Sequence, residues 1–266
     1  MGTIGLGTLV YLTGIAFIKR TIANAACHAS IGSLVSYTYS NRIKTAGILI
    51  DTSHPLIVPA VKAQLFWGLY ERAEARFIRK YLRKDLNVIE LGSSLGVISC
   101  LIRRILPKTR RLICVEAHPE LIGVIQLNLR NNFLADNVLV INKAVYYDGA
   151  VDPKVWLSTG PNTLSGKVQT VTERSGLLVE KIKLSEIVEK NAIGEYTLVS
   201  DIEGAEAGII LQSQSELANC RQMIIEFHTT DFKGQRIRDD ELRDLLLSRH
   251  GFSLRDQHGP ICVLER

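Results

Sequence analysis

From about residue 70 onward, the spacing of apolar and polar residues predicts strands and helices that follow one another in turn. Residues 72–82 place Phe77 and Ile78 on one helical stripe opposite a charged face. The apolar run at 87–91 predicts a buried strand, and apolar residues return at helical spacing over 95–106. Further strands are predicted at 111–116, 138–142, 196–202 and 223–227, with helices at 120–132, 184–191 and 238–248. Strands that alternate with helices are typical of an α/β fold with a parallel sheet.

The two ends of this pattern are less regular. Residues 252–255 and 261–264 predict an antiparallel pair of strands that is joined through His258-Gly259-Pro260. Near the start of the chain, short strands are expected at 47–51 and 56–58.

Residues 147–180 interrupt the strand and helix succession with a polar segment. Strand-like pieces occur at 155–157 and 168–171, and Gly160-Pro161 indicates a turn. An inserted hairpin, a substrate-facing flap and a plain surface ribbon all explain this pattern.

The length of 266 residues suffices for one α/β domain with a sizeable core. We expect this domain at 66–266, after an N-terminal leader at 1–65 that is apolar at its start and holds short strands or helix. Residues 2–18 carry no charge and are followed by Lys19-Arg20. A membrane span needs about 20 apolar residues, and this segment is slightly shorter. Two interpretations therefore stay open, a loosely packed leader and a membrane anchor or interfacial helix. The chain is expected in the cytoplasm, and under the second alternative at the cytoplasmic face of a membrane.

Charge and cysteine content exclude several classes of protein. The net charge of +5 comes largely from basic residues at 103–111. Basic side chains are favourable at the solvated carboxyl end of a helix, and no aromatic residues lie among them to stack on bases. We therefore expect no nucleic-acid partner. The five cysteines form no C-x-x-C pair and mostly lie in apolar runs, so neither a disulfide framework nor a zinc site is predicted.

A glycine-bracketed loop between the first strand and its helix is the strongest candidate for a ligand site. Its pattern is E-x-G-x-x-x-G, from Glu90 through Gly92 to Gly96. Dinucleotide sites use G-x-G-x-x-G, with one more glycine and a narrower gap. An acidic residue before the loop would repel a phosphate and attract the ammonium or sulfonium of S-adenosylmethionine. The loop therefore favours a methyltransferase, with a nicotinamide-dependent oxidoreductase and a plain structural turn as alternatives.

Glu116 ends the next strand and is the natural partner of this loop. The carboxyl ends of neighbouring parallel strands lie at the same edge of a sheet, and a carboxylate there can accept hydrogen bonds from both ribose hydroxyls. The pair formed by the glycine loop and Glu116 therefore predicts a nucleoside-containing ligand.

A second dense group of polar residues follows the later strands. Asp201, Glu203 and Glu206 lie close together, and alternation along a strand would put Asp201 and Glu203 on one side. Such carboxylates repel one another unless a cation, a hydrogen bond or a raised pKa relieves them. His228 ends the neighbouring strand and can point into the same crevice. A solvated helix start and a structural histidine are the alternatives.

Taken together, these motifs resemble the FkbM family of S-adenosylmethionine-dependent methyltransferases over roughly residues 66–266. The residues that carry the resemblance are Gly68-Leu69-Tyr70-Glu71 with Glu74, Glu90-Leu91-Gly92-Ser93-Ser94-Leu95-Gly96, Glu116-Ala117-His118-Pro119, Ala144-Val145, Asp201-Ile202-Glu203-Gly204-Ala205-Glu206 and Ile225-Glu226-Phe227-His228. The D-x-E-G-x-E run is the most specific of these motifs. The glycine loop is shared by class I methyltransferases in general.

The resemblance implies a class I Rossmann-like sheet of seven strands, the last antiparallel, with helices on both faces. It also implies O-methylation of a hydroxyl on a sugar, glycolipid or secondary metabolite, so the partner is a small-molecule or glycan acceptor. Glu90 would face the methionine part of the cofactor, Glu116 its ribose and Ala144 its adenine. The other residues expected at the cofactor are Gly92, Ser93, Ser94, Leu95, Gly96, Ala117 and Glu71.

Two positions depart from the family pattern. The family usually carries a lysine two positions before Asp201, where this chain has Val199. Its glycine loop often reads D-x-G-A-N-x-G, whereas this chain has Glu90 and Ser93-Ser94. Serine hydroxyls can replace the hydrogen bonds of the asparagine to the methionine carboxylate.

For the chemistry, we expect Asp201 or His228 to be the general base and Glu203 to orient it or to bind a substrate hydroxyl. No metal is predicted, although Mg²⁺ bridged by Asp201 and Glu203 is an alternative that we do not favour. A non-catalytic scaffold with the same sheet is the alternative from another class of protein. The sequence predicts neither the acceptor nor the oligomeric state.

Overall fold

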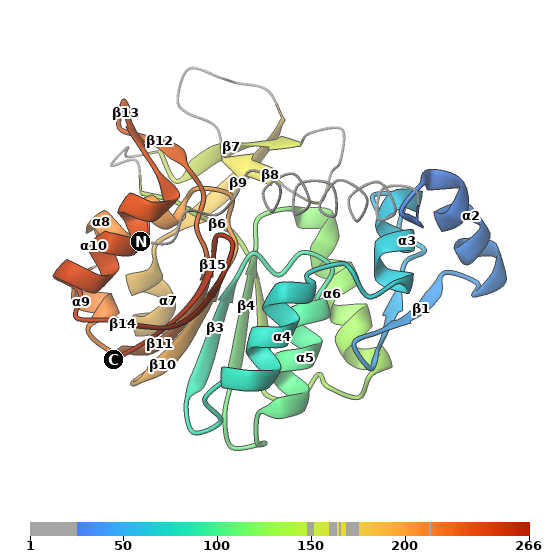
Figure 1. The fold of residues 1–266 in the computed structure, drawn as a ribbon, viewed down its shortest axis with the longest axis horizontal. Helices are drawn as coiled ribbons and strands as arrows, with labels where there is room; N and C mark the ends of the chain where they lie inside the picture. The colour runs from blue at the N-terminus through green and yellow to red at the C-terminus, as the bar shows by residue number, and fades with distance from the viewer. Residues whose placement is uncertain (1–25, 148–151, 160–163, 165, 169–175, 213) are drawn as a thin grey trace, which may run out of the picture. The chain divides into compact units, whose positions relative to one another are not determined.

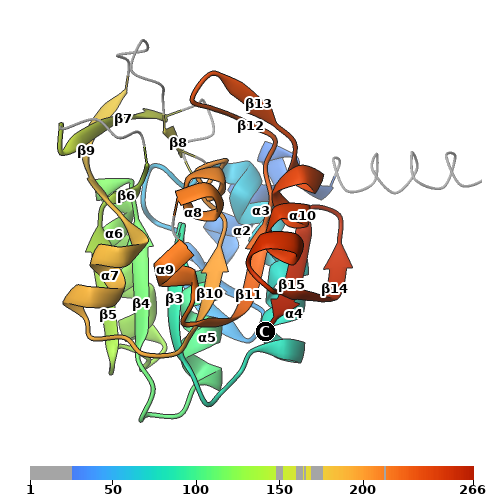
Figure 2. The same cartoon turned by 90° about the vertical axis from the view of Figure 1, so that its left-hand side faces the viewer.

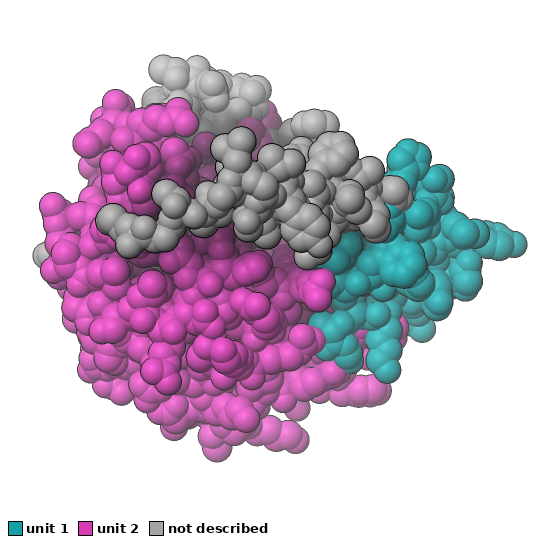
Figure 3. Space-filling view, viewed as in Figure 1, with its two compact units in different colours: residues 1–47, 51–70 teal, residues 48–50, 71–266 magenta. Residues whose placement is uncertain are grey.

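The structure is a computed structural model that describes residues 26–147, 152–159, 164, 166–168, 176–212 and 214–266. The chain divides into two compact units, one of residues 1–47 and 51–70 and the other of residues 48–50 and 71–266 (Figure 3). The apolar segment at 2–18 lies outside the described residues. Within the described part of the chain, no helix has the length and apolar content needed to span a bilayer.

The smaller unit is built around two packed helices, α2 (Ala29–Thr38) and α3 (Pro59–Phe66). Strand β1 (Arg42–Thr45) lies between them in sequence, and β2 (Ile48–Asp51) follows it. The strand expected at 56–58 is wrong, because these residues form a turn and then the start of α3. Val58 does have extended dihedral angles, as residues before proline usually do, and Pro59 opens the helix. The extended conformation was therefore local and formed no strand.

The larger unit contains a seven-stranded sheet in the order β14-β15-β11-β10-β3-β4-β5 (Figures 1 and 2). Every neighbouring pair from β11 to β5 is parallel, whereas β15 is antiparallel to both β11 and β14. This arrangement confirms the predicted sheet with an antiparallel last strand. The strands are β3 (Asn87–Leu91), β4 (Leu112–Glu116), β5 (Val138–Asn142), β10 (Tyr196–Ser200), β11 (Cys220–Glu226), β14 (Ser253–His258) and β15 (Ile261–Glu265).

Helices cover both faces of the sheet because side chains of each buried strand alternate between the faces. Val88 of β3 packs in the apolar cluster of α4 and α5, whereas Ile89 and Leu91 pack in the cluster of α7, α8 and α10. The helices of this unit are α4 (Arg72–Tyr81), α5 (Val97–Ile105), α6 (Pro119–Asn131), α7 (Leu184–Lys190), α8 (Glu206–Gln212), α9 (Gln214–Leu217) and α10 (Asp239–Arg249). These bounds confirm the predicted helices, and Pro119 is the first residue of α6 as expected.

The polar segment after β5 forms a second sheet, in the order β6-β9-β7-β8. Strand β7 is antiparallel to both of its neighbours, β8 and β9. The segment is therefore an inserted set of strands, and the piece predicted at 155–157 lies within β7. Gly160-Pro161 and residues 169–171 lie outside the described residues. The strands are β6 (Ala144–Val145), β7 (Lys154–Thr159), β8 (Gly166–Val168) and β9 (Leu177–Ile182).

Candidate functional site

The glycine loop after β3 turns sharply against the end of β10. Gly92 has a φ of +85°, and a Cβ at this position would lie 1.9 Å from the carbonyl oxygen of Asp201. The amide of Asp201 donates to the carbonyl of Leu91 at 3.0 Å, which holds the two strand ends together. Gly96 has a φ of +76° and begins α5 as its N-cap. Glycine at these two positions is therefore required by the backbone itself.

The loop and Glu116 are in direct contact. The amide of Ser94 donates to Glu116 Oε2 at 2.8 Å, and the amide of His118 donates to Oε1 of the same carboxylate at 2.8 Å. The side chain of Glu116 is 8% exposed, and burial raises its pKa despite these hydrogen bonds. Each carboxylate oxygen has a further lone pair that a ribose hydroxyl could use. The structure thus brings together the two predicted halves of the cofactor site, and it adds a role for Glu116 in shaping the loop.

Glu90 lies beneath the loop and is 1% exposed. Its Oε2 accepts hydrogen bonds from the hydroxyls of Ser93 at 3.1 Å and Ser99 at 2.6 Å, whereas Oε1 is buried and has no hydrogen-bond partner. Burial raises the pKa of Glu90 to about 7. Val199, which pairs with Glu90 across β3 and β10, is buried and brings no counter-charge. Sequence reasoning found Glu90 and Ser93 but missed Ser99, whose position one helical turn into α5 could have indicated it.

Strand β10 ends at Ser200, so the acidic run beyond it forms a turn instead of continuing the strand. Glu203 has a φ of +53° and Gly204 a φ of +104°. Alternation along a strand was therefore the wrong reason to place Asp201 and Glu203 on one side. Glu206 is fully buried and accepts hydrogen bonds from the amides of Ile202 and Gly204, each at 2.8 Å. Glu206 thus fixes the turn that presents the other two carboxylates.

His228 lies at the centre of these carboxylates. Its Nε2 is 3.7 Å from Asp201 Oδ1, 3.6 Å from Glu203 Oε2 and 3.9 Å from Glu226 Oε1. Its Nδ1 is 3.5 Å from Glu206 Oε1. The structure thus brings the three predicted catalytic residues together and adds Glu226, which sequence reasoning did not assign. The position of Glu226, two residues before His228 at the end of a strand, is the signal that could have identified it.

The electrostatics of this cluster separate the two candidate bases. Burial alone would lower the pKa of His228, but Glu206, Asp201 and Glu203 together raise the pKa to about 9. His228 is therefore an imidazolium at neutral pH and cannot accept a proton. Burial and the nearby Glu226 raise the pKa of Asp201 to about 7. Of the two candidate bases, only Asp201 therefore titrates near neutral pH.

The same cluster also has the composition of a cation site. Asp201, Glu203 and His228 can each offer one ligand atom, and these atoms lie within 4.8 Å of one another. Carboxylate oxygens with one imidazole nitrogen suit several divalent cations. The Mg²⁺ alternative stays a prediction, and such a cation would have to replace the proton of His228, because an imidazolium has no nitrogen lone pair to offer.

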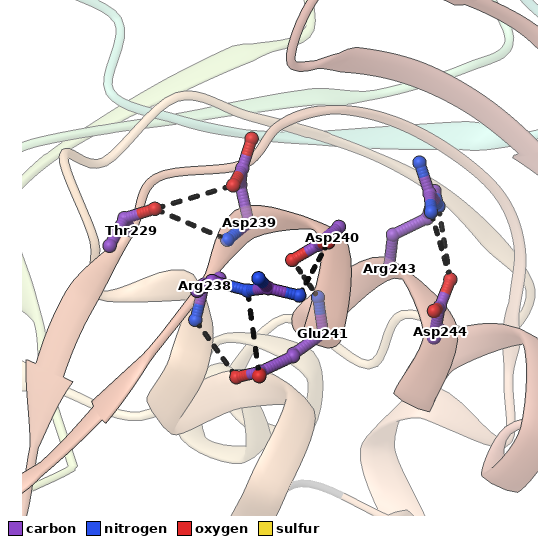
Figure 4. A network of polar contacts seen from close by, with 7 residues as sticks. All are labelled: Thr229, Arg238, Asp239, Asp240, Glu241, Arg243 and Asp244. Carbon is purple, nitrogen blue, oxygen red and sulfur yellow. Dashed lines mark hydrogen bonds and ion pairs between the residues drawn. The ribbon is translucent and has the colours of Figure 1, made fainter.

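The chain immediately after His228 is anchored to the start of α10. The hydroxyl of Thr229 lies 3.3 Å from Asp239 Oδ1 and accepts from the Asp239 amide at 3.4 Å (Figure 4). Arg238 precedes the helix, and its amide donates to Glu241 at 3.1 Å. The Thr229 contacts therefore link the residue after His228 to the first residue of α10.

The other residues expected at the cofactor occupy varied positions. Leu95 is buried, and its carbonyl accepts a hydrogen bond from the side chain of Asn128 at 2.9 Å. Ala144 is buried in β6, and Ala117 packs against the same apolar cluster of the inserted sheet. Glu71 is the N-cap of α4 and has a φ of +48°. Their contacts with a cofactor remain predictions.

Comparison with known proteins identifies a family. A model described as "Methyltransferase FkbM domain" matches residues 96–254. No curated protein matches the chain. Similar solved structures include a precorrin-6y C5,15-methyltransferase from Geobacter metallireducens, with 14% sequence identity, coverage of 72% of this chain and 86% of that chain, and a TM-score of 0.40. A methyltransferase from Geobacter sulfurreducens has 14% identity, coverage of 73% of this chain and 75% of that chain, and a TM-score of 0.42. An S-adenosylmethionine-dependent methyltransferase from Aquifex aeolicus has 10% identity, coverage of 73% of this chain and 90% of that chain, and a TM-score of 0.39.

Proposed function

The chain belongs to the FkbM methyltransferase family, and from this premise we propose that it methylates a hydroxyl of a sugar, glycolipid or secondary metabolite with S-adenosylmethionine. One observation supports the cofactor site above all others. The Ser94 amide and the Glu116 carboxylate are 2.8 Å apart, so the glycine loop and the ribose-binding candidate form one site at the carboxyl end of the sheet.

The residues present suit this cofactor. The buried Glu90 favours a cationic group above the loop, because a positive charge nearby would stabilise its carboxylate. The hydroxyl of Ser94 and the amino end of α5 suit the methionine carboxylate, whereas the single O–H of Ser93 already donates to Glu90. When bound, S-adenosylmethionine would supply a methyl group on a positively charged sulfur, which is a good leaving group.

The protein must then align the acceptor and remove its proton. As the methyl group that the cofactor would supply is transferred to the acceptor oxygen, the carboxylate of Asp201 would take the proton of the acceptor hydroxyl. His228, as an imidazolium, holds Asp201 and Glu203 close together. Glu203 is exposed enough to contact an acceptor hydroxyl. The inserted sheet of β6 to β9 is the segment that we propose to select the acceptor.

A direct test is to incubate the protein and S-adenosylmethionine with glycans and lipids extracted from cell envelopes. Mass spectrometry should detect a product that is heavier than its precursor by one methylene unit. The product should be absent when S-adenosylmethionine is omitted. If no hydroxyl compound in these extracts gains a methyl group, sugars and glycolipids of the cell envelope are excluded as acceptors.

The rate of transfer should depend on pH through Asp201. The raised pKa of Asp201, about 7, means that the carboxylate form is lost as the pH falls through 7. We expect kcat/KM to fall about tenfold per pH unit below that value. His228→Asn removes the positive charge that lowers the pKa of Asp201, so the midpoint should move to higher pH. The measurement is kcat/KM from pH 5 to 9 for both proteins, and an unchanged midpoint in His228→Asn would exclude this role of His228.

A further inference from the structure

Glu74 is a buried carboxyl group in the first turn of α4, a helix that is otherwise strongly charged on its outer face. The side chain is only 8% exposed. Among the described contacts, no hydrogen bond or ion pair reaches this carboxyl group. Burying a polar group without a partner is unfavourable, and an ionised carboxylate is more unfavourable still. A donor or a positive charge beside Glu74 would therefore stabilise its carboxylate form.

The charges that act most strongly on Glu74 come from other carboxylates. Burial, followed by the charges of Glu71, Asp201, Glu90 and Glu226, holds the pKa of Glu74 well above its usual range. Glu90 adds its own buried oxygen that has no hydrogen-bond partner. These acidic groups come from the ends of three neighbouring strands and from α4, and together they favour a cation at the carboxyl end of the sheet.

His228 does not supply this cation to Glu74. Its nitrogen atoms lie 3.5 to 3.9 Å from carboxylate oxygens of four other residues, and the described contacts include no ion pair between His228 and Glu74. A positively charged group of a ligand could therefore pair with the carboxylate of Glu74.

We infer that Glu74 binds the α-ammonium group of the methionine part of S-adenosylmethionine, an inference that rests on the proposed function. An ammonium group carries three N–H donors and prefers carboxylate acceptors. Glu90 is more deeply buried and already accepts two serine hydroxyls, so it contributes chiefly through its charge. Glu74 becomes ionised on binding, and the proton that it loses passes to solvent.

Two ligands that differ in the amino-acid part, combined with a substitution of Glu74, test the contact with the ammonium group. S-adenosylhomocysteine carries the amino-acid part, whereas 5′-methylthioadenosine has the same adenosine and sulfur without it. Isothermal titration of the full chain should show that Glu74→Gln lowers the affinity for S-adenosylhomocysteine about 10-fold to 100-fold. The affinity for 5′-methylthioadenosine should stay unchanged. Glu189→Gln, at an exposed residue of α7, is the matched control and should change neither affinity.

A second readout separates ligand binding from a structural effect. In buffers of different ionisation enthalpy, the unaltered protein should release protons when it binds S-adenosylhomocysteine, and Glu74→Gln should release fewer. If Glu74→Gln lowers the affinity for both ligands equally, or for neither, the inference is wrong while the proposed function stands. If the unaltered protein binds neither ligand, the proposed function itself fails.

Discussion

Replacing Asp201 with asparagine is expected to lower the turnover of methyl transfer by about 10²-fold to 10⁴-fold. Asparagine has nearly the same volume but cannot take the proton of the acceptor hydroxyl. The backbone contacts of this residue with Leu91 and Gly92 do not involve its side chain, so the glycine loop should keep its shape. Affinity for S-adenosylmethionine should therefore change little. The measurements are steady-state turnover on an identified acceptor and calorimetric titration of the cofactor.

The control for this variant is Asp136→Asn, which changes an exposed aspartate in the turn before β5. We expect normal turnover from it. If Asp201→Asn also keeps its turnover, Asp201 is not the base. If the variant loses cofactor affinity and turnover in equal measure, Asp201 acts in binding instead.

Replacing Gly92 with alanine should remove cofactor binding and destabilise the fold by about 3 kcal/mol or more. The new Cβ would lie 1.9 Å from the carbonyl oxygen of Asp201, and backbone atoms on both sides would have to move. The φ of +85° adds strain for any residue with a Cβ. Urea unfolding and calorimetric titration with S-adenosylmethionine would measure the two effects.

Gly123→Ala is the matched control for this substitution. Gly123 lies in α6, and a Cβ there would meet no atom within 4 Å. Alanine is the better helix former, so this variant should gain up to about 1 kcal/mol of stability. Equal stability and equal cofactor affinity in the two variants would show that the loop does not need glycine at 92.

Periodicity and glycine spacing predicted most of the sheet and the cofactor loop. Strands β3, β4, β10 and β11 are buried on both faces, so their apolar runs are unambiguous. The contact of the loop with Glu116 follows from the parallel order of β3 and β4. In contrast, residues 56–58 resemble a strand because Pro59 extends the residue before it, and no local pattern could reveal that α3 follows directly.

The acidic cluster around His228 was predicted less well, because turns and tertiary burial determine its arrangement. Glu206 looked like an ordinary acidic residue in a first helical turn, yet it is fully buried and fixes the preceding turn. Glu74 appeared only as part of the family motif, and no local pattern indicated that the structure buries it. The charge state of His228 depends on four carboxylates from two strand ends and a turn. The burial and the neighbouring charges of these side chains depend on the tertiary fold. The spacing of residues along the sequence cannot predict them.

The most direct test of the account is isothermal titration of the full chain and of Glu116→Ala with S-adenosylmethionine, with Glu189→Ala as a surface control. We expect saturable binding that is at least about tenfold weaker in Glu116→Ala, because the variant loses both the carboxylate for the ribose and the acceptor of the Ser94 amide. Absence of binding to the unaltered protein, or equal affinity in Glu116→Ala, would contradict it and leave an α/β scaffold without the proposed cofactor site.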